Sequence, residues 1–277
     1  MESSKRRSYL NGTFSGASIV LLMLTVSACM TMRATNSGSS TESFLSQERI
    51  AGIVASPDRS AADRTLDVRR KPEQMLAFVG VKPGMVVLDL SAGGGYSTEL
   101  LARAVGPNGR VYGQSVPRAL DSPPLPPGRL TSPQALAERA RNPVVANIIP
   151  VVRKFEDPAP PELLSGGIDL VTIMFNYHDL GHMGVERSQM NKAVFAALKP
   201  GGHFVVADHS GRPGTGISES GTLHRIEEAF LRQEVESAGF KFVDQGNFLR
   251  NPSDPRDKNT PEPPQPKDEF VLKFVKP

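Results

Sequence analysis

The sequence predicts a doubly wound α/β fold, with helices on both faces of a mostly parallel, seven-stranded sheet. Two observations support this prediction. Short apolar runs alternate with helix-forming segments along residues 47–277. The clearest run, residues 168–175, is apolar at nearly every position, which is typical of a strand buried on both faces. A length of 277 residues with 39% hydrophobic and 22% charged residues fits one globular domain with appendages.

The predicted elements follow one another regularly along the domain. Apolar runs indicate strands at 85–88, 110–115, 148–152, 168–175, 203–207, 240–243 and 270–275. Helical periodicity indicates helices at 48–55, from Pro72, and at 97–103, 133–141, 187–198 and 222–238. The proline-rich residues 117–133 are expected to be a lid or a surface loop, and residues 251–267 a surface loop. The alternating charges of 58–70 are typical of a solvated surface.

A glycine-rich turn joins the first strand to the next helix. The strand leads into Asp89, and three glycines, 93–95, come before the helix that begins near Ser97. Glycines leave out the side chains that would keep a ligand from the backbone at a helix N-terminus. Asp89 is placed either to accept hydrogen bonds from that ligand or to hold the loop in shape. The turn therefore predicts a ligand site at the carboxyl edge of the sheet.

The spacing Asp-x-Ser-x-Gly-x-Gly resembles motif I of the class I S-adenosylmethionine-dependent methyltransferases, with Ser91 where the first glycine usually stands. The Leu-Lys-Pro-Gly-Gly of residues 198–202 is a second landmark of that family. A group of predicted exported bacterial methyltransferases has segments that resemble residues 176–179, 207–209 and 223–226 of this chain. The resemblance covers 47–277 and implies a Rossmann-like sheet with S-adenosylmethionine as the cofactor.

The resemblance also implies the residues that bind the cofactor. Members of the family usually end the second strand in an acidic residue that binds the ribose hydroxyls. Here that strand ends in Gln114 and Ser115, and a neutral hydrogen bond from either is about half as strong as a charge-assisted one. The expected cofactor-binding residues are Asp89, Ser91, Ala92, Gly93, Gly95, Tyr96, Ser115, Asp157 and Asn176.

Histidines and carboxylates follow the fourth and fifth predicted strands. On a helical wheel for 222–238, His224 and Glu227 lie within the apolar arc and Arg225 lies outside it, so the first two should turn inward. A histidine oriented by a carboxylate can act as a general base if the methyl acceptor must lose a proton. The expected catalytic residues are His178, Asp179, Asp208, His209, His224 and Glu227, with His178 or His209 as the base.

The same cluster could instead hold a divalent metal ion. The chain has no tight ligand spacing such as His-x-x-x-His, so we expect no metal. His182 and His203 are expected to be structural or exposed.

The N-terminal segment predicts export. A basic stretch at 5–7 precedes an apolar run at 17–26 that is too short to span a bilayer, and Val26-Ser27-Ala28-Cys29 resembles a bacterial lipobox. We therefore expect a lipoprotein-type signal peptide at 1–28, lipidation at Cys29 and a flexible tether at 29–46. An ordinary signal peptide or a single N-terminal anchor is the alternative. Residues 6–10 resemble a twin-arginine export signal, and a plain basic stretch explains them equally well.

These features predict a lipid-anchored protein of the bacterial cell envelope, facing the periplasm. Without residues 1–28 the chain has 29 basic and 28 acidic residues, which gives no general attraction to nucleic acid. The predicted function is methyl transfer from S-adenosylmethionine to a small-molecule acceptor. The alternative is a catalytically inactive, methyltransferase-like binding lipoprotein, which the location favours because the envelope makes no S-adenosylmethionine. A metal-dependent hydrolase on this scaffold is a third hypothesis.

Overall fold

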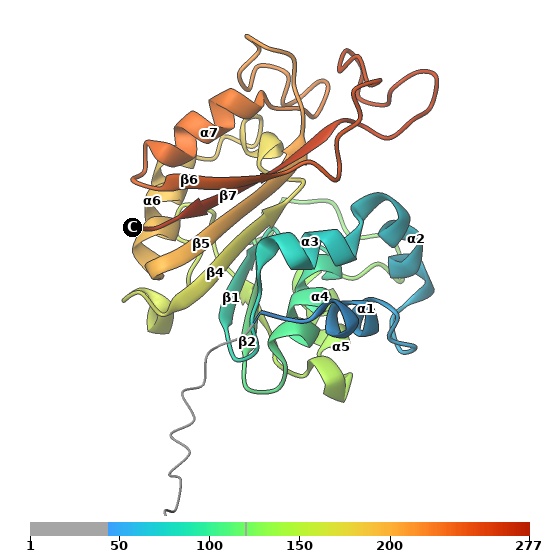
Figure 1. The fold of residues 1–277 in the computed structure, drawn as a ribbon, viewed down its shortest axis with the longest axis vertical. Helices are drawn as coiled ribbons and strands as arrows, with labels where there is room; N and C mark the ends of the chain where they lie inside the picture. Colours follow the sequence, from blue (N-terminus) through green and yellow to red (C-terminus); the bar gives the residue numbers. More distant parts are fainter. Residues whose placement is uncertain (1–43, 120) are drawn as a thin grey trace, which may run out of the picture. The chain divides into compact units, whose positions relative to one another are not determined.

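The computed structural model describes residues 44–119 and 121–277 (Figure 1). The predicted signal peptide at 1–28 and the lipidation site Cys29 lie outside the described residues, as does most of the predicted tether at 29–46. In the part of the chain that the structure describes, every helix is too short or too polar to cross a bilayer.

One seven-stranded sheet forms the centre of the described domain, in the order β3-β2-β1-β4-β5-β7-β6. The first five of these strands are parallel neighbours, and β7 pairs antiparallel with both β5 and β6. The predicted mostly parallel, doubly wound fold is therefore confirmed. The strands are β1 Val86–Leu90, β2 Arg110–Ser115, β3 Ile148–Val152, β4 Ile168–Met174, β5 Leu198–His209, β6 Lys241–Gly246 and β7 Glu269–Val275.

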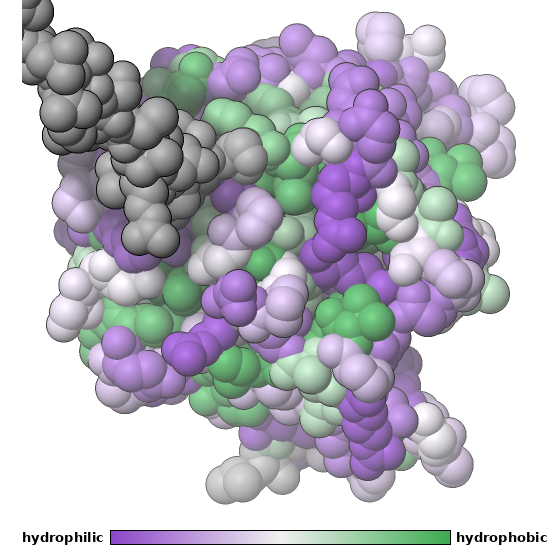
Figure 2. All heavy atoms as spheres, turned by 60° about the horizontal axis from the view of Figure 1, so that its bottom comes forward, coloured by the Kyte–Doolittle hydropathy of each residue, from purple (hydrophilic) through white to green (hydrophobic). Residues whose placement is uncertain are grey.

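Helices cover both faces of the sheet (Figure 1). Alternate residues of β1 point to opposite faces, so Val87 packs with α1, α3, α4 and α5, whereas Leu88 packs with α6 and α7. The helices are α1 Gln47–Val54, α2 Ala61–Arg70, α3 Pro72–Val79, α4 Tyr96–Val105, α5 Ser132–Arg139, α6 Arg187–Ala197 and α7 Glu228–Glu236. On the face that Figure 2 shows, apolar side chains form small separate areas between polar ones, as is usual for a folded surface.

The direction in which the chain adds strands reverses between β1 and β4, and a ligand site is expected at this point of the sheet. The chain continues outward from β1 to β2 and β3 on one side, and from β4 to β5 on the other. Loops that leave the carboxyl ends of β1 and β4 therefore diverge, and the crevice between them is where such folds bind ligands.

The predicted helix 222–238 is wrong over its first six residues. Ile226 forms a bridge with Ser210 beside the end of β5, and its N–H donates to the carbonyl of His209 (3.1 Å). Arg225, expected at the surface, is fully buried, and its guanidinium lies 2.9 Å from the carboxylate of Asp254. The bridge at Ile226 and this buried ion pair replace the expected first turns of the helix, and α7 begins at residue 228.

Most of residues 58–70 are exposed, as their alternating charges suggested, but two of the charged side chains are buried. Arg59 is buried and pairs with Asp67 at 2.7 Å. Asp63, also buried, pairs at 2.6 Å with Arg139 of α5, which in turn pairs with Glu99 of α4. These charges are buried because each has an oppositely charged, hydrogen-bonded partner. Their network joins α2 to the helices that flank the glycine loop.

Candidate functional site

Asp89 shapes the glycine loop from behind. It is fully buried, and its carboxylate accepts hydrogen bonds from the hydroxyls of Ser97 (2.8 Å), Thr98 (2.7 Å) and Thr172 (2.7 Å). Burial raises the pKa of Asp89, and the three hydroxyl hydrogen bonds act in the opposite direction. Both carboxylate oxygens are therefore used inside the protein, and of the two roles considered for Asp89 the structure favours holding the loop.

The loop presents bare backbone on its outer side. A Cβ atom added at Gly94 would have no neighbour within 4 Å, and one at Gly93 would meet only the carbonyl oxygen of Ser91, at 3.8 Å. Gly95 differs, because a Cβ there would lie 2.8 Å from the side chain of Leu136 in α5. Gly93 and Gly94 thus leave room for a ligand, whereas Gly95 is needed for packing.

Gln114 at the end of β2 holds the loop and is not free for a ligand. Its Oε1 accepts the backbone N–H of Ser91 (2.9 Å), and its Nε2 donates to the carbonyl of Arg153 (2.7 Å). Ser91 has a φ of 53°, a left-handed conformation that favours glycine. This conformation explains why glycine is the usual residue at this position of the motif.

A cavity of about 570 Å³ opens beside the loop, a volume typical of small-molecule sites. Ser91 and Gly93 line it from the loop, Ser115 from the end of β2, and Asn176 from the residues after β4. The Oγ of Ser115 is buried and has no hydrogen-bond partner among the described residues. A hydroxyl without a partner in a cavity is suited to a ligand, and it occupies the place where the motif usually has a carboxylate.

Five expected cofactor-binding residues do not line this cavity; Asp89 and Gly95 are described above, and the other three have different surroundings. Asp157 pairs with Arg153, and 57% of its side chain is exposed. Ala92 is buried behind the loop. Tyr96 donates its hydroxyl to Asp67 (2.7 Å) and lines a smaller hollow on the other side of the loop.

Arg70 lines that smaller hollow together with Tyr96, Ser97 and Phe175. Its guanidinium carbon lies 4.9 Å from the centre of the Tyr96 ring and 5.1 Å from that of Phe175. Its buried Nε has no hydrogen-bond partner among the described residues. Arg70 was not among the predicted site residues, because it lies within the charged segment 58–70. The signal that could have found it is its position two residues before the proline that begins α3.

The histidine cluster begins at the carboxyl ends of β4 and β5. His178 opens a short 3₁₀ helix, His178–Leu180, and its Nδ1 lies 2.5 Å from Asp208 Oδ1. The fully buried Asp208 also accepts the backbone N–H groups of His178 (2.7 Å) and His209 (2.8 Å). Burial alone would lower the pKa of His178, but the Asp208 and Asp179 carboxylates outweigh it and the pKa is raised.

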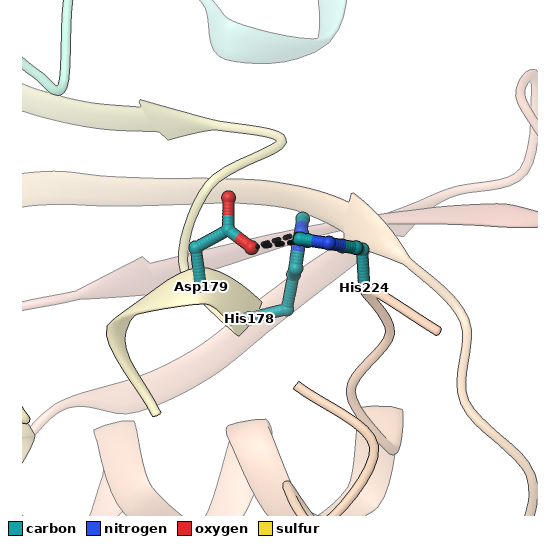
Figure 3. A group of neighbouring side chains, drawn as sticks. All are labelled: His178, Asp179 and His224. Carbon is teal, nitrogen blue, oxygen red and sulfur yellow. Dashed lines mark hydrogen bonds and ion pairs between the residues drawn. The ribbon is translucent and has the colours of Figure 1, made fainter. Parts of the chain in front are cut away.

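Asp179 joins His178 and His224 (Figure 3). Its Oδ1 lies 3.0 Å from His178 Nε2 and 2.7 Å from His224 Nδ1. Its Oδ2 accepts a hydrogen bond from Asn176 Nδ2 (3.0 Å). Because Asn176 also lines the cavity, the histidine cluster and the cavity are neighbours.

His209 lies behind this cluster. Its ring packs between Phe175 (5.7 Å between ring centres) and His178 (5.2 Å), and its Nδ1 is 3.0 Å from Glu269 Oε1 without the geometry of a hydrogen bond. Burial lowers the pKa of His209 to about 3 and raises that of Glu269 to about 7. The His209 ring is therefore neutral near neutral pH.

One prediction about the cluster is wrong. Glu227 does not reach the histidines, because residues 222–227 are not helical and its carboxylate accepts the backbone N–H of Gly216 (2.9 Å). His182 was expected to be structural or exposed, and it is exposed, but it also lies beside the cluster. Its ring centre is 5.6 Å from that of His224, and its Nδ1 is 2.9 Å from Ser220 Oγ. The sequence places His182 in a loop after the 3₁₀ helix and contains no signal for this proximity.

Comparisons with known proteins find similarity to methyltransferases. The model of the protein-L-isoaspartate (D-aspartate) O-methyltransferase family matches residues 44–120. Fibrillarin 3 of Arabidopsis thaliana is 26% identical over 156 residues, which are 56% of this chain and 46% of the relative. The ubiquinone/menaquinone biosynthesis C-methyltransferase UbiE of Burkholderia multivorans is 28% identical over 142 residues, 49% of this chain and 47% of the relative. The chain thus spans about half the length of these curated relatives.

A solved structure shows the likeness of the whole domain. An S-adenosylmethionine-dependent methyltransferase from Aquifex aeolicus aligns with a TM-score of 0.53 and 19% identity, covering 83% of this chain and 98% of that one. The chain therefore has the Rossmann-like fold of the class I S-adenosylmethionine-dependent methyltransferases. The matching family model and this fold support S-adenosylmethionine as the cofactor.

Proposed function

We propose that this protein is an S-adenosylmethionine-dependent methyltransferase that acts on a small-molecule acceptor. One observation supports the proposal most strongly: a cavity at the carboxyl edge of the sheet is bordered by open glycine backbone and by the unpartnered Ser115 hydroxyl. The printed activities of the relatives differ from one another, so they support methyl transfer as the reaction class without naming this acceptor.

The residues present fit the proposed cofactor in two places. The Ser115 hydroxyl would bind the ribose, since it lies at the end of β2 and has no hydrogen-bond partner among the described residues. Arg70 would bind the carboxylate of the methionine part, since its guanidinium is partly buried beside the loop and, within the part of the chain that the structure describes, makes ring contacts without a hydrogen bond. Both groups would gain their missing hydrogen bonds from the ligand.

S-adenosylmethionine supplies an electrophilic methyl group when it is bound. Transfer of that group is an in-line displacement, so the protein's main contribution is alignment of the acceptor and exclusion of water. Asn176 borders the cavity and fixes Asp179, which ties the position of the histidine cluster to that of the cofactor. We assign this cluster to the acceptor side, where His178 between its two carboxylates would hold the proton of a hydroxyl or amine acceptor.

A specific observation favours the second candidate function, a binding protein without catalysis. Arg118 and Arg129 line the cavity, and no carboxylate of the described residues does. This charge suits an anionic ligand better than the sulfonium of S-adenosylmethionine. Under this alternative the same cavity binds another, negatively charged small molecule.

Calorimetric titration of the full chain with S-adenosylmethionine tests the proposal. Gly93→Val places a side chain in the cavity and should lower the affinity at least 100-fold. Gly84→Val is the matched control, because Gly84 also has a positive φ (83° against 55°) and open space but lies outside the cavity. The control variant should bind normally. Failure of the parent chain to bind would overturn the proposal in favour of the binding protein.

Arg70→Met tests the assignment of the carboxylate. Loss of a charged hydrogen bond of about 1.5–3 kcal/mol corresponds to roughly 10- to 100-fold weaker binding of S-adenosylmethionine. Binding of 5′-methylthioadenosine, which lacks the amino-acid part, should not change. Equal weakening of both ligands would contradict the assignment.

We also propose that the chain is exported and lipid-anchored through Cys29. The proposal is supported by the basic stretch, the short apolar run and the lipobox-like residues 26–29. Cys29→Ala should move the protein from the membrane fraction to the soluble periplasmic fraction. Unchanged membrane association of this variant would contradict lipidation at Cys29.

A further inference from the structure

Three potential metal ligands converge in the histidine cluster (Figure 3). His178 Nε2, Asp179 Oδ1 and His224 Nδ1 all lie within 4.8 Å of one another. The two nitrogens are 3.0 and 2.7 Å from the oxygen. Zinc binds such atoms at about 2.0–2.2 Å in tetrahedral geometry, which separates neighbouring ligand atoms by roughly 3.3 Å. Side-chain movements of well under 1 Å would therefore open the cluster for a metal ion.

Two of the three ligands are already oriented by hydrogen bonds from their other atoms. His178 Nδ1 lies 2.5 Å from the fully buried Asp208, which leaves Nε2 toward the cluster. Asp179 Oδ2 accepts from Asn176, which leaves Oδ1 toward the two imidazoles. A carboxylate behind a ligating histidine is the usual support of a protein metal site, since it sets the tautomer and the ring direction.

The backbone brings the third ligand to the cluster from a distant part of the chain. His224 has a φ of 51°, an uncommon conformation for a residue other than glycine. The next residue, Arg225, is fixed by its buried ion pair with Asp254 and by hydrogen bonds to the carbonyls of Ser210 (2.9 Å) and Lys258 (3.0 Å). Strained backbone held by such anchors is characteristic of functional sites.

The charges of the cluster call for a cation. Asp208 and Asp179 lie on opposite sides of the buried His178 ring. Within the described residues their ion-pair partners are histidines only, without lysine or arginine. A divalent ion at His178 Nε2 would balance the charge of the two carboxylates.

The cluster is open to solvent on one side. The side chains of His224 and Asp179 are 38% and 23% exposed, whereas that of His178 is 3% exposed. The neighbouring His182 has its Nδ1 3.8 Å from Asp179 Oδ1. Three protein ligands with an exposed fourth position resemble the arrangement of catalytic zinc sites more than that of closed structural ones.

We propose that His178, Asp179 and His224 bind a divalent transition-metal ion of the zinc class, with water or His182 in the fourth position. Two imidazoles and one carboxylate favour Zn²⁺ over Mg²⁺, which prefers oxygen ligands and retains its waters. The sequence analysis expected no metal because the ligands are not regularly spaced; two are adjacent and the third follows 45 residues later. The site shares His178 with the acceptor side of the proposed methyl transfer, and a metal ion at Nε2 would take the place of the proton assigned to that ring. Zinc binding itself does not require S-adenosylmethionine, so the two proposals can be tested separately.

Zinc binding by the full chain tests the proposal. The protein is stripped with a chelator, Cys29 is alkylated in every sample, and Zn²⁺ is titrated by calorimetry without S-adenosylmethionine. We expect one ion per chain with micromolar or tighter affinity, and no binding of Mg²⁺ under the same conditions. His224→Ala should weaken zinc binding at least 100-fold.

Two further variants make the test specific. His203→Ala is the matched control, because it removes a half-buried histidine of β5 away from the cluster and should leave zinc affinity unchanged. Asp208→Asn should weaken binding 10- to 100-fold through the orientation of His178. Metal-free thermal unfolding shows whether each variant folds. Absence of stoichiometric zinc binding, or equal binding by folded His224→Ala and the parent chain, would overturn the proposal.

Discussion

Two regions at the same edge of the sheet use a buried aspartate in different ways. Asp89 in the glycine-loop region (residues 89–97) and Asp208 in the histidine region (residues 176–182, 208–209 and 224) are both fully buried at strand ends. Asp89 accepts three hydroxyl hydrogen bonds, whereas Asp208 binds one imidazole and two backbone amides. The residue type at the strand end is the same, and the donors around it decide whether it shapes a backbone surface or orients a titratable ring.

The difference extends to the charge of the two regions. The cavity beside the glycine loop is lined by Arg118 and Arg129 and by no carboxylate of the described residues. The histidine region contains the Asp179 and Asp208 carboxylates. Adjacent sites with opposite charge preferences can hold two different ligands, and Asn176 belongs to both.

The largest expected effect concerns the support of the histidine region. Arg225→Met leaves Asp254 buried without its partner and should lower the free energy of unfolding by about 3–5 kcal/mol. The double variant Arg225→Met/Asp254→Leu removes both charges and should recover most of that loss. Urea denaturation measures both. If the two regions bind their ligands independently, the folded double variant will lose zinc affinity and retain S-adenosylmethionine affinity. Loss of S-adenosylmethionine affinity with unchanged zinc affinity would contradict this independence.

A smaller effect concerns pH. Burial raises the pKa of Glu269 to about 7 in the folded protein from an ordinary 4.5. The folded state therefore keeps a proton that the unfolded state loses, and the free energy of unfolding falls as the pH rises through this window. The full loss is about 3 kcal/mol. Glu269→Gln removes this titration. The free energy of unfolding of the variant minus that of the parent should therefore be about 3 kcal/mol higher at pH 8 than at pH 4.5.

Urea denaturation of both proteins at the two pH values measures this change. A relative stability that does not vary with pH would show that the ion pair with Arg69, 2.5 Å away, keeps Glu269 ionised throughout. The carboxyl group beside His209 would then be ionised, not protonated, below pH 7.

The smallest expected effect comes from relieving backbone strain, which occurs at one residue in each region. Ser91 and His224 have φ values of 53° and 51°, and glycine adopts this conformation at little cost. Ser91→Gly should stabilise the fold by up to ~1 kcal/mol in thermal denaturation and leave zinc binding unchanged. His224→Gly relieves similar strain but should abolish high-affinity zinc binding. A clear loss of stability in Ser91→Gly would show that the serine side chain, not the backbone conformation, supports the loop.

Local patterns predicted the sheet and the edge at which its functional groups meet. The apolar run of β4 and the glycine turn after β1 each occupy a few consecutive residues, so their structure follows from nearby chemistry. His178 and His209 were expected to be neighbours because parallel strands end at one edge, and their ring centres lie 5.2 Å apart.

The helical wheel failed at 222–227 because the deciding interaction is distant in sequence. Arg225 pairs with Asp254, 29 residues later, and this buried pair outweighs the modest free-energy differences that favour a helix. The buried charges of segment 58–70 were missed for the same reason, since Asp63 finds its partner Arg139 76 residues away. A charge pattern shows that partners are needed but not where they lie.

By itself, the sequence determined the α/β class, the order of the strands along the chain and the strand-glycine-helix turn, because apolar periodicity and glycine act within a few residues. Only the tertiary structure decided that Gln114 is used internally, that Arg70 Nε and Ser115 Oγ have no hydrogen-bond partner among the described residues, and that His224 joins His178 and Asp179. The physical reason is that burial and hydrogen-bond satisfaction depend on every neighbour in space, and at this site most neighbours come from distant parts of the chain.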